Sequence, residues 1–303
     1  MKHFASRLFL AAALLVQPAM AQTTEQVTSA VGTVPFSAGQ SNSFLYLTGN
    51  TIGFMTQAPT MQDIVEQNLI NALAYAQNDP LSGVDFSSVT AVLSFGQSAE
   101  RVTILFGAPG FATAAPETLA RRHFEQRDIA GWTVFGLHED GALDLNFNDP
   151  DPFATPNGRP QRLAISGTIL VSTASWAKME EVLTALEIPP PSSDLWLATL
   201  DGSRKAMAGQ EPTSIMGFTT NGNPAVTPLS SISMLTFAYS EDGVTMVSAS
   251  PYDSAESAEL GARTIQERTG NVHPPGATVS IEVEPSPPHF IGMIKITEPT
   301  AQP

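Results

Sequence analysis

The chain has 303 residues, a formal net charge of −15 and no cysteine, and 42% of its residues are hydrophobic. Such a composition is typical of a globular protein with a core, excludes disulfide bonds, and disfavours nucleic acid and anionic membrane surfaces as partners. The negative charge favours solubility but identifies no ligand.

Residues 1–21 have the pattern of a secretory signal peptide. Lys2 and Arg7 precede a short apolar run, and Ala19-Met20-Ala21 supplies small residues before a cleavage site at Gln22. The apolar run is too short to cross a bilayer stably, so we expect no membrane insertion after cleavage. Cleavage removes two basic residues and no acidic one, which leaves a net charge of about −17. The sequence therefore predicts a periplasmic or secreted protein.

The next segment, residues 22–43, is polar and is predicted to be flexible. Residues 44–47 fit a short strand. Apolar residues at helical spacing then predict a helix over residues 61–76.

A stretch near residue 90 recurs in the second half of the chain. With a constant shift of 142 positions, residues 93–126 align with residues 235–268 without a gap and share 10 identities in 34 positions. Each copy reads as strand, turn, strand and helix. The predicted elements are 89–95, 102–106 and 116–127 in the first copy, and 232–239, 244–247 and 254–268 in the second. The pattern favours an internal duplication, although two unrelated hairpin–helix units remain the alternative.

The duplication makes residue-level predictions. Leu93 and Leu235 should both face a core, and the small residues Ala120 and Ala262 should let each helix approach its sheet closely. Acidic and basic residues spaced four apart predict a charged row on each helix, namely Glu117, Arg121 and Glu125, and Glu259, Arg263 and Glu267.

The rest of the chain continues the mixed pattern. We predict strands at 131–137, 163–171, 214–220, 277–283 and 290–296, and helices at 175–186 and 194–207. Pro189-Pro190-Pro191 interrupts any helix or central strand, so it is the predicted boundary. The resulting fold class is α+β, with two pseudo-repeated halves, residues 44–188 and 189–303. Each half is expected to be mainly antiparallel sheet with helices packed on one face.

One sequence motif suggests nucleophilic catalysis. Ser175-Trp176-Ala177-Lys178 matches S-x-x-K, the acylation motif of penicillin-binding enzymes. The supporting Lys-Thr-Gly motif is missing, and Ser192-Ser193-Asp194 is only a fragment of Ser-Asp-Asn. We therefore interpret Ser175 as the N-cap of a helix.

Three other groups of residues could form a metal or ligand site: an oxygen-rich loop, the histidines and the tryptophans. The loop containing Asp144, Asn146, Asn148, Asp149 and Asp151 is rich in oxygen ligands but lacks the glycine and closing glutamate of a calcium-binding EF-hand. The histidines downstream of the signal show no zinc-ligand spacing; they are His123, His138, His273 and His289. Trp132, Trp176 and Trp196 are interpreted as packing residues rather than a sugar platform.

No set of reactive residues converges, so we assign no catalytic, cofactor-binding or metal-binding residue. The leading hypothesis is an exported, non-catalytic binding or interaction protein of the bacterial cell envelope. Its partner would be an unknown protein or small molecule. The alternative is a periplasmic or secreted hydrolase with an unrecognised acidic site. A third hypothesis is an assembly role through an exposed sheet edge.

Overall fold

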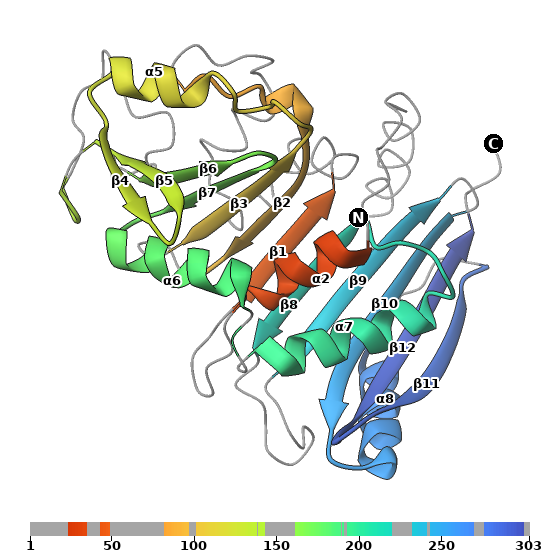
Figure 1. The fold of residues 1–303 in the computed structure, drawn as a ribbon. Coiled ribbons are helices and arrows are strands. Elements are labelled where there is room, and N and C mark those ends of the chain that lie inside the picture. The colour runs from red at the N-terminus through yellow and green to blue at the C-terminus, as the bar shows by residue number, and fades with distance from the viewer. Residues whose placement is uncertain are drawn as a thin grey trace. The chain divides into compact units, whose positions relative to one another are not determined.

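The computed structural model describes residues 24–34, 43–48, 82–96, 101–137, 139–142, 161–188, 190, 193–219, 232–240, 243–269 and 276–299. These residues form a mixed α+β protein with a large antiparallel sheet (Figure 1), as the composition and pattern predicted. The chain divides into two compact units. The N-terminal unit includes residues 47–92 and 99–180, and the C-terminal unit comprises residues 23–46, 93–98 and 181–303.

The N-terminal unit is built on strands in the order β2-β3-β7-β6-β5-β4. Its elements are the short 3-10 helix Phe86–Ser88, most of β2 (Val89–Phe95), β3 (Val102–Gly107), α5 (Ala115–Arg121), β4 (Glu125–Ile129), β5 (Trp132–Gly136), β6 (Arg162–Ser166), β7 (Ile169–Thr173) and the start of α6 (Trp176–Glu187). The single strand predicted at 163–171 is wrong. Ser166 pairs with Ile169, so the chain reverses at Gly167. Gly167 has a φ of 53°, a conformation that glycine adopts readily.

Helix α5 ends earlier than predicted, because it terminates in a Schellman motif. His123 has a φ of 64°; its N–H donates to the Ala120 carbonyl, and that of Phe124 donates to Leu119. Phe124 and Leu119 occupy the two positions whose apolar side chains usually meet in this motif, and both are buried. Glu125 therefore begins β4 instead of extending the predicted charged helical row.

The C-terminal unit has its strands in the order β1-β8-β9-β10-β12-β11. Its elements are α2 (Thr24–Gly32), β1 (Ser43–Thr48), α7 (Asp194–Ala206), β8 (Ser214–Thr219), β9 (Ile232–Ser240), β10 (Gly243–Tyr252), α8 (Ala255–Thr269), β11 (Thr278–Ser286) and β12 (His289–Pro299). Strand β12 lies between β10 and β11 and pairs antiparallel with both.

Helices cover both faces of this unit's sheet, which corrects the prediction that they pack on one face. Met293 of β12 clusters with Ala206 of α7, whereas the next residue, Ile294, clusters with Ala262 of α8. Successive side chains of a strand point to opposite faces, so α7 and α8 lie on opposite sides (Figure 1). The prediction failed because β10 and β12 carry apolar residues at both odd and even positions.

The prediction of a flexible segment at residues 22–43 is also wrong for its first part. Residues 24–32 form α2, and Val27, Ala30 and Val31 are buried within the C-terminal unit. Helix α2 contacts α7. The few apolar residues of this polar segment lie at helical spacing, so one narrow face is enough to dock it.

The two hairpin–helix units share their element order, strand-strand-helix, in β2-β3-α5 and β9-β10-α8. The constant shift of 142 fails at the helices: Ala120 is exposed whereas Ala262 is buried. Leu93 is completely buried and Leu235 is half-buried. The pseudo-repeat is therefore not confirmed residue by residue.

Several predicted elements lie outside the described residues. These are the signal peptide at 1–21, the helix at 61–76 and the oxygen-rich loop from Asp144 to Asp151. Of the proline boundary, only Pro190 is described. No helix within the described ranges combines the length and the apolar character that crossing a membrane requires.

Candidate functional site

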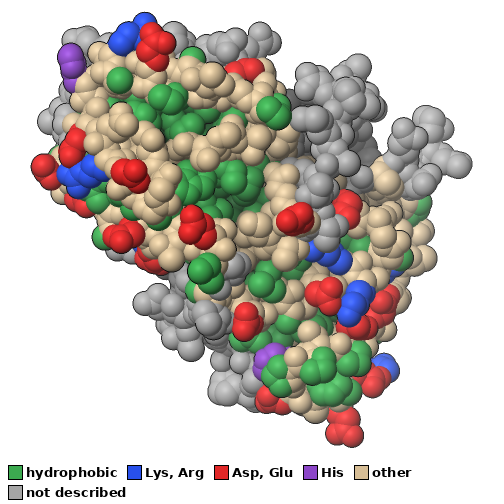
Figure 2. All heavy atoms as spheres, in the orientation of Figure 1, with side chains coloured by type: hydrophobic (Ala, Val, Ile, Leu, Met, Phe, Trp, Pro, Cys, Tyr) green, Lys and Arg blue, Asp and Glu red, His purple; other side chains and the backbone are tan. Residues whose placement is uncertain are grey.

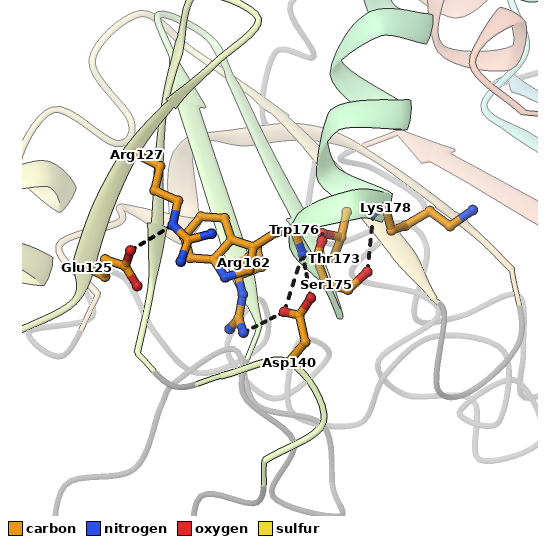
Figure 3. A network of polar contacts seen from close by, with 8 residues as sticks. All are labelled: Glu125, Arg127, Asp140, Arg162, Thr173, Ser175, Trp176 and Lys178. Atoms are coloured by element: carbon orange, nitrogen blue, oxygen red, sulfur yellow. Dashed lines mark hydrogen bonds and ion pairs between the residues drawn. The ribbon is translucent and has the colours of Figure 1, made fainter.

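A polar network surrounds Trp176 in the N-terminal unit (Figure 3). Register brings its members together, because Glu125, Gly136 and Arg162 are directly opposed on the neighbouring strands β4, β5 and β6. Trp176 is the first residue of α6 and follows β7 by two residues. The network is therefore fixed by four adjacent strands and one helix start.

Asp140 links the buried side of the network to the helix. Its Oδ1 atom accepts a hydrogen bond of 2.7 Å from Nη2 of Arg162, whose side chain is 0% exposed, while the Asp140 side chain is 42% exposed. The backbone N–H of Trp176 also donates to the Asp140 carboxylate, with distances of 3.2 and 3.3 Å to its two oxygens. The single carboxylate therefore neutralises a buried cation and caps the start of α6.

Two guanidinium groups stack on the Trp176 ring. The Cζ atom of Arg127 lies 3.9 Å from the ring centroid and that of Arg162 lies 4.9 Å from it. Gly136 makes this arrangement possible, since a Cβ there would lie 2.7 Å from Trp176 Cζ2 and 2.8 Å from Arg162 Cδ. Each cation–π contact stabilises by about 0.5–2 kcal/mol, more where the cation is desolvated.

Glu125 forms the outer end of the network. Its Oε1 atom accepts a hydrogen bond of 2.7 Å from Nε of Arg127, and the two side chains are 53% and 40% exposed. The hydrogen bond from Arg127 lowers the pKa of Glu125 below its ordinary value, and the same bond raises the pKa of Arg127. The pair therefore stays ionised in moderately acidic solution.

The structure confirms Ser175 as a helix cap. Its Oγ atom accepts a hydrogen bond of 3.2 Å from the backbone N–H of Lys178, the third residue of α6. In Figure 3 the Lys178 side chain extends away from Ser175. This orientation does not match the acylation motif, in which the lysine side chain helps to activate the serine.

The other candidates from the sequence are not brought together. His123 lies at the end of α5 and His289 begins β12, while His138 and His273 lie outside the described residues. Trp196 is buried with its ring edge-on to Phe44, and Trp132 is half-buried. Within the described part of the chain, no three His, Asp or Glu residues are grouped closely enough to hold a metal ion.

Two or more buried carboxylates facing one cleft would favour the hydrolase hypothesis. Among the described residues, the buried polar and charged side chains include Arg162 but no aspartate or glutamate. In Figure 2 the acidic side chains are spread over the visible face, with basic side chains beside several of them. The acidic hydrolase site stays an untested prediction.

Sequence reasoning missed the network because its members are separated by up to 51 positions, from Glu125 to Trp176. One signal was present: Arg127 and Arg162 are two of only 14 basic residues in the chain, and both lie in predicted or adjacent strand segments. Their convergence depends on the register of β4 to β7, which the single-strand interpretation of 163–171 concealed.

The chain matches no protein-family model and no curated protein. Among solved structures it is similar to TP0453 in its crystal form I, with 12% sequence identity and a TM-score of 0.39. The match covers 88% of this chain and 92% of that chain. A similarity at this level carries no argument about function.

Proposed function

We propose that this is an exported, non-catalytic binding protein of the bacterial cell envelope that recognises a protein partner. The recognition surface would be formed by Glu125, Arg127, Asp140 and Trp176, which we call the Trp176 surface. The observation that carries the proposal is the stacking of Arg127 at 3.9 Å on Trp176, with the arginine side chain still 40% exposed.

Arginine and tryptophan are the side chains most often found at the energetic centres of protein interfaces. Ordering a long side chain on binding costs about 0.5–1.5 kcal/mol. Here Arg127 is already ordered by the Trp176 ring on one side and by Glu125 on the other. Such pre-organisation supports a role in recognition.

The charges of this surface favour a protein over a nucleic acid. Glu125 and Asp140 stand beside Arg127, so the surface offers both signs within one small area. The whole chain carries a net charge of −15, which repels a polyanion. Export rests on the signal-like pattern of residues 1–21, and mass spectrometry of the exported protein should find Gln22 at its N-terminus.

The test compares two exposed, ion-paired arginines. A partner captured from the native envelope with the wild-type chain would be purified, and its Kd measured for Arg127→Ala and Arg263→Ala. Arg263 is the matched control, since it pairs with Glu259 at 2.6 Å and is 60% exposed, but lies in the C-terminal unit. We expect Arg127→Ala to weaken binding at least about tenfold, or ~1.4 kcal/mol. Equal affinities for the two variants would contradict the proposal.

We also propose that the fold arose by duplication of a hairpin–helix unit. Two features of the topology support this. In both hairpin–helix units the helix follows the hairpin, and a later strand pairs with the second strand of the hairpin: β7 pairs with β3, and β12 pairs with β10. A shift of 143 rather than 142 aligns the buried helical residues Ala115 and Leu119 with Ala258 and Ala262. An experimental structure in which the two hairpin–helix units do not superpose would contradict it.

A further inference from the structure

The C-terminal unit is assembled from distant parts of the chain. Residues 23–46 belong to it together with residues 181–303, whereas most of the chain between them forms the N-terminal unit. The early segment supplies α2 and most of β1, and β1 lies next to β8. The segment α2–β1 therefore completes a unit whose main part begins at residue 181, more than 130 positions later.

Helix α2 docks through an apolar face, and a hydrogen bond to α7 adds a polar contact. Val27, Ala30 and Val31 are at most 1% exposed. The Oγ1 atom of Thr28 accepts a hydrogen bond of 2.7 Å from Nη1 of Arg204 on α7. This bond fixes the position of α2 along α7, which the short apolar side chains alone would define less sharply.

Strand β1 inserts an aromatic side chain into the core of the C-terminal unit. Phe44 is 1% exposed, and its ring meets Trp196 of α7 edge-on, with centroids 5.1 Å apart and an interplanar angle of 89°. The ring also covers Gly217 of β8, where a Cβ would overlap it. Gly217 and Trp196 therefore form the site that accepts the Phe44 ring. We call this site the receptor.

A second aromatic residue of β1 is buried as well. Tyr46 is 0% exposed, and burial raises the pKa of its hydroxyl group. The α2–β1 segment thus holds its place by contacts spread along its length. None of these contacts is covalent, because the chain has no cysteine.

We infer that α2–β1 is an exchangeable element, and that the C-terminal unit accepts it from a second copy of this chain to form a domain-swapped dimer. The segment is linked covalently to the rest of the C-terminal unit only through its own C-terminal end, after Tyr46. A second copy offers the same Phe44, Thr28 and Val31, so every contact made within one chain is reproduced between two. The two forms then differ only in the connection after β1 and in protein concentration.

The test uses complementary defects in two full chains. Phe44→Ala weakens the segment but leaves its receptor intact. Gly217→Val blocks the receptor, because its side chain would occupy the place of the Phe44 ring, but leaves the segment intact. Each variant carries a different tag, and the two are unfolded in urea and refolded together. Light scattering and sequential tag purification measure the heterodimer.

The mixture should yield at least about tenfold more heterodimer than either variant yields homodimer, because only the mixture unites an intact segment with an intact receptor. Recovery of folded protein from the mixture, where neither variant refolds alone, would support the inference equally. If neither the mixture nor its components refold, the milder pair Val31→Ala and Gly217→Ala decides. Folded, monomeric variants that give a monomeric mixture would overturn it.

Discussion

Replacing Asp140 with alanine should destabilise the N-terminal unit by about 2–4 kcal/mol. The change removes a hydrogen bond to a buried guanidinium, which contributes about 1.5–3 kcal/mol, and a helix cap, which contributes about 0.5–2 kcal/mol. We place the total below the sum of the upper limits, because the Asp140 side chain is 42% exposed and water can partly replace it.

Urea unfolding followed by circular dichroism measures this loss. Asp128→Ala is the control, since Asp128 is an exposed aspartate on β4, and among the described residues it has no ion pair. Asp140→Asn separates the two roles, because its amide oxygen can still cap Trp176 but carries no charge to balance Arg162.

The double variant with Arg162→Met gives the sharpest check. If the buried, uncompensated cation is the main cost, Asp140→Ala/Arg162→Met should be more stable than Asp140→Ala alone. A loss of less than about 0.5 kcal/mol for Asp140→Ala, equal to that of Asp128→Ala, would refute the reasoning. So would the absence of any rescue by Arg162→Met.

Three other changes test local features of the fold. Ala130 and Gly131 both have positive φ in the β4–β5 turn, so Ala130→Asn should stabilise by about 0.5–1 kcal/mol in urea unfolding. Gly261→Ala should destabilise by about 1–3 kcal/mol, because a Cβ there would overlap the buried ring of Tyr252, and thermal unfolding would show it. Burial raises the pKa of Asp85, but hydrogen bonds from neighbouring serines outweigh it and lower the pKa overall. The contribution of Asp85 is therefore present above its unfolded pKa of about 3.9 and lost as pH falls through the folded pKa, so the cost of Asp85→Ala should shrink below about pH 4.

The coarse fold was predictable because hydrophobic periodicity reports on single elements. The predicted helix at 194–207 and strand at 214–220 match α7 and β8 to within one residue at each end. Errors arose where one residue changes the chain's direction. Gly167 splits an apolar run into β6 and β7. His123 ends α5 in the left-handed conformation, where glycine is the usual residue and would have marked the helix end in the sequence.

The network around Trp176 could not be predicted from local pattern. It requires the register that places Glu125 opposite Gly136 and Gly136 opposite Arg162, and register depends on turns that the sequence specifies only weakly. The docking of α2 was missed for a different reason. Its partner α7 lies about 170 positions later, so no neighbouring residue in the sequence indicates what Val27 and Val31 pack against.

Site-specific photo-crosslinking in intact cells tests the proposed recognition surface most directly. A photoreactive amino acid would replace Arg127 in one strain and Arg263, an exposed arginine of the C-terminal unit, in another. We predict that ultraviolet light produces a discrete crosslinked protein from position 127 and none from position 263. Crosslinking to the same partner from both positions, or from neither, would contradict the assignment of recognition to the Trp176 surface.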